Sequence, residues 1–178
     1  MNVRYLFLTV FLTICFSATA QKNDFQQEVI NYLTTNGTVK QYESVFDDMF
    51  VVIKQQFSGA NIPETEWANL KNSKSKDVDM AIRMFASAYR KHFTQDQIIA
   101  MNNFFGTPAG VQMRINPEAL NADQRKEVKA FYDSEAGQNL NSVSGELTTD
   151  VSQISEYWSR DLFNEKMNAL IAKGYSPQ

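Results

Sequence analysis

The sequence predicts an all-α protein: a single multi-helix bundle that contains a degenerate helical-hairpin repeat and ends in a long C-terminal helix. Three observations predict this class. Apolar residues recur at spacings of three and four along nearly the whole chain after residue 20, and no long alternating, β-branched segment argues for a sheet. In addition, two motifs with the character of a capping box mark helix starts at Thr94 and Asn121.

The first twenty residues have the three parts of a secretory signal peptide. Arg4 lies in a short basic start, residues 5–16 form an apolar run, and the small Ala18 and Ala20 occupy the alternate positions that a signal peptidase accepts. The run is shorter than the roughly 20 apolar residues that span a bilayer. We therefore predict a cleavable signal over residues 1–20, no stable membrane insertion after cleavage, and a periplasmic or secreted location in a Gram-negative envelope.

Charge and cysteine content limit the function classes of the remaining domain, residues 21–178. Loss of Arg4 from 17 basic residues, against 20 acidic ones, changes the net charge from −3 to −4, and a mildly acidic chain is a poor nucleic-acid binder. The only cysteine, Cys15, lies in the predicted signal after the bulky Ile14, where a lipobox has a small residue. No disulfide is expected, so a single packed core must provide the stability.

Helix boundaries in the first half follow from local signals. Asp24 caps a first helix, which ends at residues 36–37 because glycine supplies a left-handed C-cap. The second helix collects its apolar residues on one face: Tyr42, Val45, Phe46, Met49, Phe50, Ile53 and Phe57. Pro63 begins a short third helix, and the polar run 71–76 predicts a loop. The next helix is predicted to be central, with the stripe Val78, Ile82, Phe85 and Tyr89.

A degenerate repeat relates residues 93–113 to residues 120–140. The matches are Asp96-Gln97 with Asp123-Gln124, Phe104-Phe105 with Phe131-Tyr132, Thr107 with Ser134, and Ala109-Gly110 with Ala136-Gly137. Each unit starts one helix at its capping box and a second helix after its aromatic pair, with a glycine that allows close backbone approach. The repeat predicts two packed helical hairpins, and a paired ligand groove is the alternative.

The C-terminal region continues as one apolar stripe. An uninterrupted helix over residues 134–173 would be about 60 Å long, whereas a domain of this size has a radius of gyration of roughly 15 Å. We therefore expect the helix to break within residues 144–150 or to project. A projecting helix would expose Trp158 and Phe163 as an interface to a second copy or a partner. Packing within the chain is the preferred alternative.

Two segments, residues 89–94 (YRKHFT) and 104–110 (FFGTPAG), resemble the signature of an exported bacterial family, the domain of unknown function 2059. The likeness covers roughly residues 40–175, with a weaker echo in residues 131–137. Gly106 departs from the pattern, because a polar or basic residue is more usual after the aromatic pair. The resemblance implies a helical secreted or periplasmic protein and brings no established activity.

The sequence predicts no catalytic residue, cofactor or metal site. His92 is the only histidine, which excludes a multi-histidine metal site within one chain, and a half-buried or helix-capping role is expected for it. Glu43 and Asp47 are four residues apart and could form an acid/base pair, but they lie on the polar face of the second helix. Two solvated carboxylates are the simpler interpretation.

Three function classes remain. The preferred one is a non-catalytic protein-interaction module of the bacterial envelope that binds an unknown partner or itself. The second is a small-molecule or lipid carrier with an apolar cavity lined by Phe46, Phe50, Met84, Phe104 and Phe131. The third is a carboxylate-dependent envelope hydrolase, which would need Glu43 and Asp47 to converge with Tyr89 or His92 in a cleft.

Overall fold

The computed structural model describes residues 24–178 and confirms the all-α class, with no strand among these residues. The predicted signal, residues 1–20, lies outside the described residues. Residues 24–35 are helical, and the elements that follow are α2 (Thr38–Gln56), α3 (Glu64–Lys71), α4 (Lys74–His92), α5 (Gln95–Phe105), α6 (Pro108–Ile115), the 3₁₀ turn η1 (Pro117–Ala119), α7 (Ala122–Asp133) and α8 (Glu135–Ile171).

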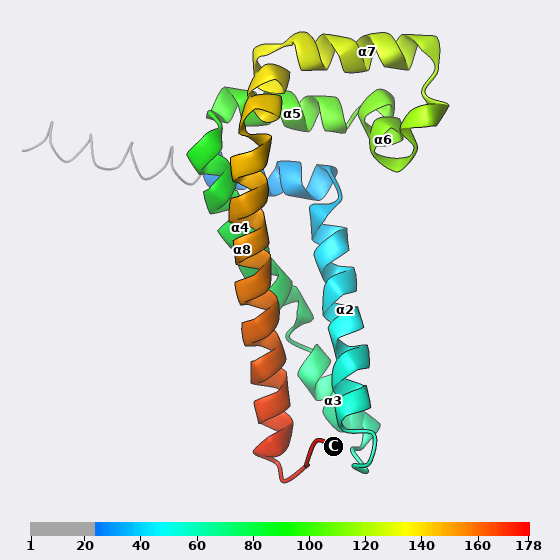
Figure 1. Ribbon diagram of the computed structural model, residues 1–178, viewed down its shortest axis with the longest axis vertical. Helices are drawn as coiled ribbons and strands as arrows, with labels where there is room; N and C mark the ends of the chain where they lie inside the picture. The colour runs from blue at the N-terminus through cyan, green and yellow to red at the C-terminus, as the bar shows by residue number, and fades with distance from the viewer. Residues whose placement is uncertain (1–23) are drawn as a thin grey trace, which may run out of the picture.

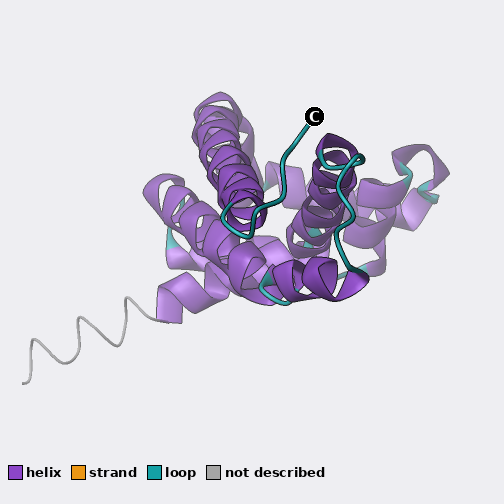
Figure 2. Cartoon of the chain, turned by 90° about the horizontal axis from the view of Figure 1, so that it is seen from below, coloured by secondary structure: helices purple, strands orange, loops and turns teal. Residues whose placement is uncertain are grey.

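The long helices α2 and α8 run downwards from a transverse layer that contains α5 and α7, and α4 runs back towards that layer at an incline to both (Figure 1). Helix α4 contacts both α2 and α8, which confirms its predicted central position. Seen from below, the long helices do not lie in one plane but surround a shared interior (Figure 2). Helix α8 contacts α5 and α7 near its start and α2 and α4 further along, so it joins the two layers.

The core is one cluster to which all the longer helices contribute. Helix α2 buries its predicted face at Tyr42, Phe46, Phe50 and Ile53, and Phe57 just after the helix is also buried. Val45 is an exception, since 37% of it is exposed. Opposite these residues lie Val78, Ile82 and Phe85 of α4 and Trp158, Leu162 and Leu170 of α8.

The left-handed turn predicted after the first helix is confirmed. Gly37 has a φ of +87°, a conformation that glycine adopts without the steric cost a side chain brings. By contrast, the loop predicted over residues 71–76 is wrong, because only Asn72 and Ser73 separate α3 from α4. The hydroxyl of Ser73 donates to Asp77 Oδ2 at 2.6 Å, and this contact holds the polar run in the first turn of α4.

Helix α8 is continuous for 37 residues, so the predicted break within residues 144–150 does not occur. At 1.5 Å per residue it is about 55 Å long. Gly145 lies within this stretch, where a glycine costs about 1 kcal/mol relative to alanine. Packing along both layers outweighs that local cost, and the preferred alternative, a helix packed within the chain, is the one observed.

Both predicted capping boxes are formed. The Gln97 amide N–H donates to Thr94 Oγ1 at 3.3 Å and the Gln124 amide N–H to Asn121 Oδ1 at 2.9 Å, and each glutamine side chain accepts from the cap residue's N–H in return. The second helix of each segment is capped alike, by Thr107 at the start of α6 and by Ser134 at the start of α8. Residues 93–113 and 120–140 therefore share one local geometry.

Candidate functional site

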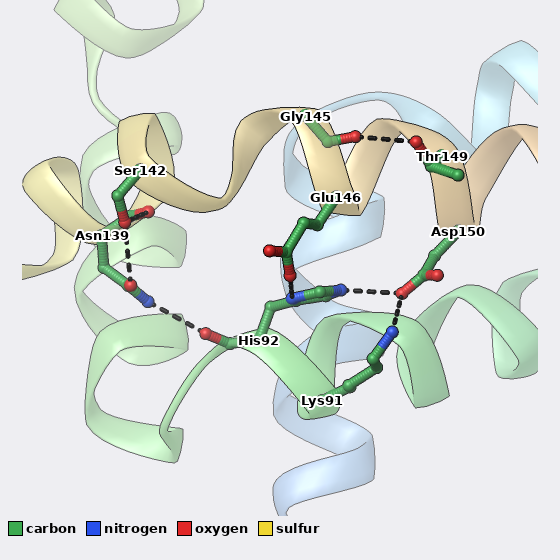
Figure 3. A network of polar contacts seen from close by, with 8 residues as sticks. All are labelled: Lys91, His92, Asn139, Ser142, Gly145, Glu146, Thr149 and Asp150. Carbon is green, nitrogen blue, oxygen red and sulfur yellow. Dashed lines mark hydrogen bonds and ion pairs between the residues drawn. The ribbon is translucent and has the colours of Figure 1, made fainter.

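The most connected polar cluster surrounds His92, the last residue of α4, where it faces α8 (Figure 3). The ring Nε2 lies 2.7 Å from Asp150 Oδ2, and Nδ1 lies 3.8 Å from Glu146 Oε2. Lys91 Nζ donates to the same oxygen of Asp150 at 2.8 Å. Two carboxylates from adjacent turns of α8 thus hold the C-terminal end of α4.

Asn139 extends this cluster to the start of α5. Its amide group donates to the His92 carbonyl oxygen and to Gln97 Oε1, at 3.0 Å each, and Gln97 in turn donates to Glu135 Oε1 at 3.0 Å. The last carbonyl groups of a helix have no partner within the helix, so Asn139 satisfies one of them for α4. The cluster joins α4, α5 and α8 where the two layers meet.

A histidine beside an aspartate is a common acid/base arrangement, but this one is closed. Only 4% of the His92 side chain is exposed, and both ring nitrogens face carboxylate oxygens of the chain itself. A general base needs a ring nitrogen within reach of a substrate proton. Asp150 accepts hydrogen bonds from Lys91 and from His92, and these two bonds, with the Lys91 bond the larger cause, lower the pKa of its carboxyl group. This geometry makes His92 a structural residue that fixes α4 to α8.

The residues predicted for a hydrolase are not brought together. Asp47 pairs with Lys74 at 2.7 Å, at the first residue of α4, and His92 ends the same helix about 27 Å further along at 1.5 Å per residue. Tyr89 lies between the rings of Tyr32 and Phe93, and burial raises the pKa of its hydroxyl. The carboxylate pair of α2 therefore lies near the start of α4, whereas Tyr89 and His92 lie at its end, and the four groups do not converge in one cleft.

Three surface cavities also bear on function, and none of the three is enclosed. The first, about 400 Å³, lies between the starts of α5 and α8, and the second, about 350 Å³, lies beside Lys91 and Asp150. The third, about 230 Å³, lies between residues 24–35, α2 and α4. Of the residues predicted to line a carrier cavity, Met84 lines the second, whereas the remaining four are buried core residues: Phe46, Phe50, Phe104 and Phe131.

A buried ion pair between α4 and α8 was not anticipated. Lys166 Nζ lies 2.9 Å from Asp77 Oδ2, and the two side chains are only 4% and 8% exposed. The indole of Trp158 donates to the Asp77 carbonyl oxygen at 2.8 Å. The sequence did contain a signal, because Lys166 continues the four-residue spacing of Trp158 and Leu162, a position at which an apolar residue is expected.

The expected exposure of the interface residues Trp158 and Phe163 is not observed. Trp158 is only 2% exposed, its ring lies 5.3 Å from that of Tyr42, and it supplies no exposed surface. Phe163 is half-buried and packs against the core. Projection of α8 would have been needed to expose both residues, and α8 instead packs along α2 and α4.

An apolar surface is present on α2 instead. Val45 and Val52 are 37% and 46% exposed, and the half-buried Met49 lies between them. Spacings of four and three place the three side chains on one face of the helix, which we call the α2 stripe. Asp47 and Lys54, about half a turn away around α2, pair with Lys74 and Glu64. The α2 stripe therefore lies on the edge of the helix away from α3 and the start of α4.

The described part of the chain offers neither a cluster of metal ligands nor a membrane-spanning helix. Between residues 24 and 178 there is no group of three or more His, Cys, Asp or Glu side chains placed to hold a metal ion. Over the same range, every helix is too short or too polar to cross a membrane.

Comparison with known proteins gives one match. No curated protein and no solved structure matches the chain significantly. The matching family model covers most of the central helix α4, all of α5 and most of α6, and so includes His92, Phe104 and Phe105. Residues 79–114 match the family described as "Uncharacterized protein conserved in bacteria (DUF2059)", which confirms the resemblance inferred from the sequence.

Proposed function

We propose that this protein is a non-catalytic protein-interaction module of the bacterial envelope and that it binds a partner protein, or a second copy of itself, through the α2 stripe. The observation that carries the proposal is the exposure of Val45 and Val52 on one face of α2. Exposed apolar residues that are contiguous, rather than scattered singly, are typical of interaction sites.

Two further features favour binding over catalysis or transport. The only histidine is used in the contact between α4 and α8, with Nε2 hydrogen-bonded to Asp150 and Nδ1 3.8 Å from Glu146. Four of the five side chains considered for a carrier cavity are at most 7% exposed and fill the core. The envelope location rests on the signal pattern of residues 1–20 and on the family resemblance.

The test is photo-crosslinking in the host cell. A photo-reactive amino acid replaces the exposed Asp48, next to the α2 stripe, in the wild-type background and in V45T/V52T. Threonine keeps the branched shape of valine but adds a hydroxyl group, so the helix is retained and the apolar surface is reduced. We expect a discrete adduct in the wild type and its loss in V45T/V52T.

The matched control is I99T/I115T, which changes two exposed isoleucines in α5 and α6 and should leave the adduct intact. An adduct of twice the chain mass would identify self-association, and any other discrete mass would identify a partner. Adducts that persist in V45T/V52T, or their absence in every background, would contradict binding through the α2 stripe.

A further inference from the structure

The cavity of about 230 Å³ between residues 24–35, α2 and α4 has an apolar floor and a polar rim. The floor is formed by Ile30, Val39, Val78 and Ile82, and the rim by Thr34, Glu43, Ser75 and Asp79. Glu43 lies on the side of α2 that faces α4, whereas Val45 and Val52 lie on the opposite edge. The cavity is therefore separate from the α2 stripe.

The rim carries an unbalanced negative charge. Asp79 is paired with Arg83 at 2.7 Å, and the nearby Lys74 is paired with Asp47. No lysine or arginine lines the cavity. Glu43 forms no hydrogen bond or ion pair with another residue in the described part of the chain. The charge and the floor together fit a group that is cationic at its end and apolar along its stem.

The size of the cavity limits what this group can be. Sites for complete small-molecule ligands usually have volumes of about 300–1,000 Å³, and this cavity is below that range. It has room for a single long side chain. Lysine and arginine both combine an aliphatic stem with a charged end, but the planar guanidinium group binds a carboxylate through two parallel hydrogen bonds and is less strongly hydrated.

We propose that this cavity binds an arginine side chain of a partner protein, with the guanidinium group on Glu43 and the aliphatic stem against Val39 and Ile82. Arginine is among the residues that most often supply the binding energy of an interface by filling a pocket. The inference rests on the proposed interaction function, but it concerns a second surface and does not depend on the α2 stripe.

The test is a ligand titration of the protein purified from its own host, in which NMR records the chemical shifts of the backbone amides at each ligand concentration. The probes are the N-acetyl amides of arginine, of its neutral isostere citrulline, and of lysine. We expect saturable shifts for arginine, centred on Glu43, Ser75 and Asp79, and at least about tenfold weaker binding of citrulline because the ionic hydrogen bonds are lost. The lysine probe should also bind more weakly than arginine.

Two isosteric variants test the role of charge. E43Q should weaken arginine binding about tenfold, whereas D48N removes an exposed carboxylate from the same helix and should leave it unchanged. V45T/V52T should also bind arginine normally. Failure of the proposed binding through the α2 stripe can therefore be distinguished from failure of the proposed arginine binding in the cavity.

Three outcomes would overturn the proposal. The first is the absence of localised shifts up to about 100 mM arginine probe, which would saturate a millimolar site. The second is equal binding of arginine and either of the other two probes. The third is an equal effect of E43Q and D48N, which would show that Glu43 has no specific role.

Discussion

The rings of Phe104 and Phe131 stack face to face, with centroids 4.1 Å apart and planes 5° from parallel. These residues occupy matching positions in residues 93–113 and 120–140, so the two segments pack against each other through their first aromatics. The second aromatic of each unit, Phe105 or Tyr132, lies edge-on to the first at 5.2 Å in both cases. The aromatic pairs thus form the contact between α5 and α7, as expected for two packed hairpins and not for an open groove.

The first prediction concerns this contact. Phe104 and Phe131 are each 7% exposed, and replacing either with alanine should reduce the free energy of unfolding by about 3–5 kcal/mol. The double variant F104A/F131A should cost less than the sum of the single variants, by about 0.5–1.5 kcal/mol, because each single change already removes the ring-ring interaction. Denaturant unfolding followed by circular dichroism measures all three values.

The control for this prediction is I115A, because Ile115 is 70% exposed and should contribute less than about 0.5 kcal/mol. Strictly additive losses from the two phenylalanines would show that the stacked contact has no energy of its own.

The second prediction concerns the glycine one turn inside the second helix of each unit. A Cβ at Gly110 would lie 2.2 Å from the Phe104 carbonyl oxygen, and a Cβ at Gly137 would lie 2.2 Å from that of Phe131. Alanine normally stabilises a helix by about 0.5–1 kcal/mol relative to glycine. At these two positions it should instead destabilise the protein, because the backbone must shift to relieve the clash.

Gly145 provides a matched control within α8, since a Cβ there would meet nothing within 4 Å. G145A should raise the melting temperature, while G110A and G137A should lower it. If G110A and G137A raised the melting temperature as G145A does, the close approach at Gly110 and Gly137 would be disproved.

Features that depend on neighbouring residues were predictable from the sequence. A capping box is satisfied by residues three positions apart, and both boxes are present where the sequence placed them. The turn at Gly37 and the buried face of α2 also follow from local spacing. A polar run such as residues 71–76 is compatible with a loop and with an exposed helical turn. Here the contacts of Ser73 and Asp77 with the distant Lys166 favour the helix.

The candidate site was less predictable, because its partners are distant along the chain. Asp150 lies 58 residues after His92, and helical spacing specifies only that Glu146 and Asp150 share one face of α8. Which helix that face meets depends on how the layers pack. The burial of Trp158 depends on the same packing, because the stripe on α8 is compatible with an exposed interface as well as with the preferred packed core.

The third prediction concerns the buried pair of Lys166 and Asp77. K166M leaves Asp77 as an uncompensated charge in the interior, so it should reduce the free energy of unfolding by about 3–5 kcal/mol. D77N should cost less, because Glu165 Oε1 still lies 2.8 Å from Lys166 Nζ. Replacing both groups in K166M/D77L leaves no buried charge, and much of the loss should be recovered. Chemical denaturation at pH 7 tests this. A double variant that is less stable than both single variants would contradict the interpretation.

The fourth prediction is a pH dependence at Asp150. Lys91 and His92 lower the pKa of this carboxyl group in the folded protein, so ionised Asp150 stabilises the fold above the unfolded-state pKa of about 3.9. That contribution is lost as the pH falls through the lowered pKa. The difference in unfolding free energy between the wild type and D150N should therefore be full at pH 7 and should shrink below about pH 4.

The variant K91M separates the two causes of this pKa shift. Lys91 is the larger one, so without it the loss of the Asp150 contribution should move to higher pH, towards the value of an unperturbed carboxyl group. Urea unfolding of the wild type, D150N, K91M and K91M/D150N between pH 2.5 and pH 7 measures both effects. Parallel stability curves for the wild type and D150N across this range would show that Asp150 has the same proton affinity in the folded and unfolded states, and the cluster at the end of α4 would then be held by packing and not by charge.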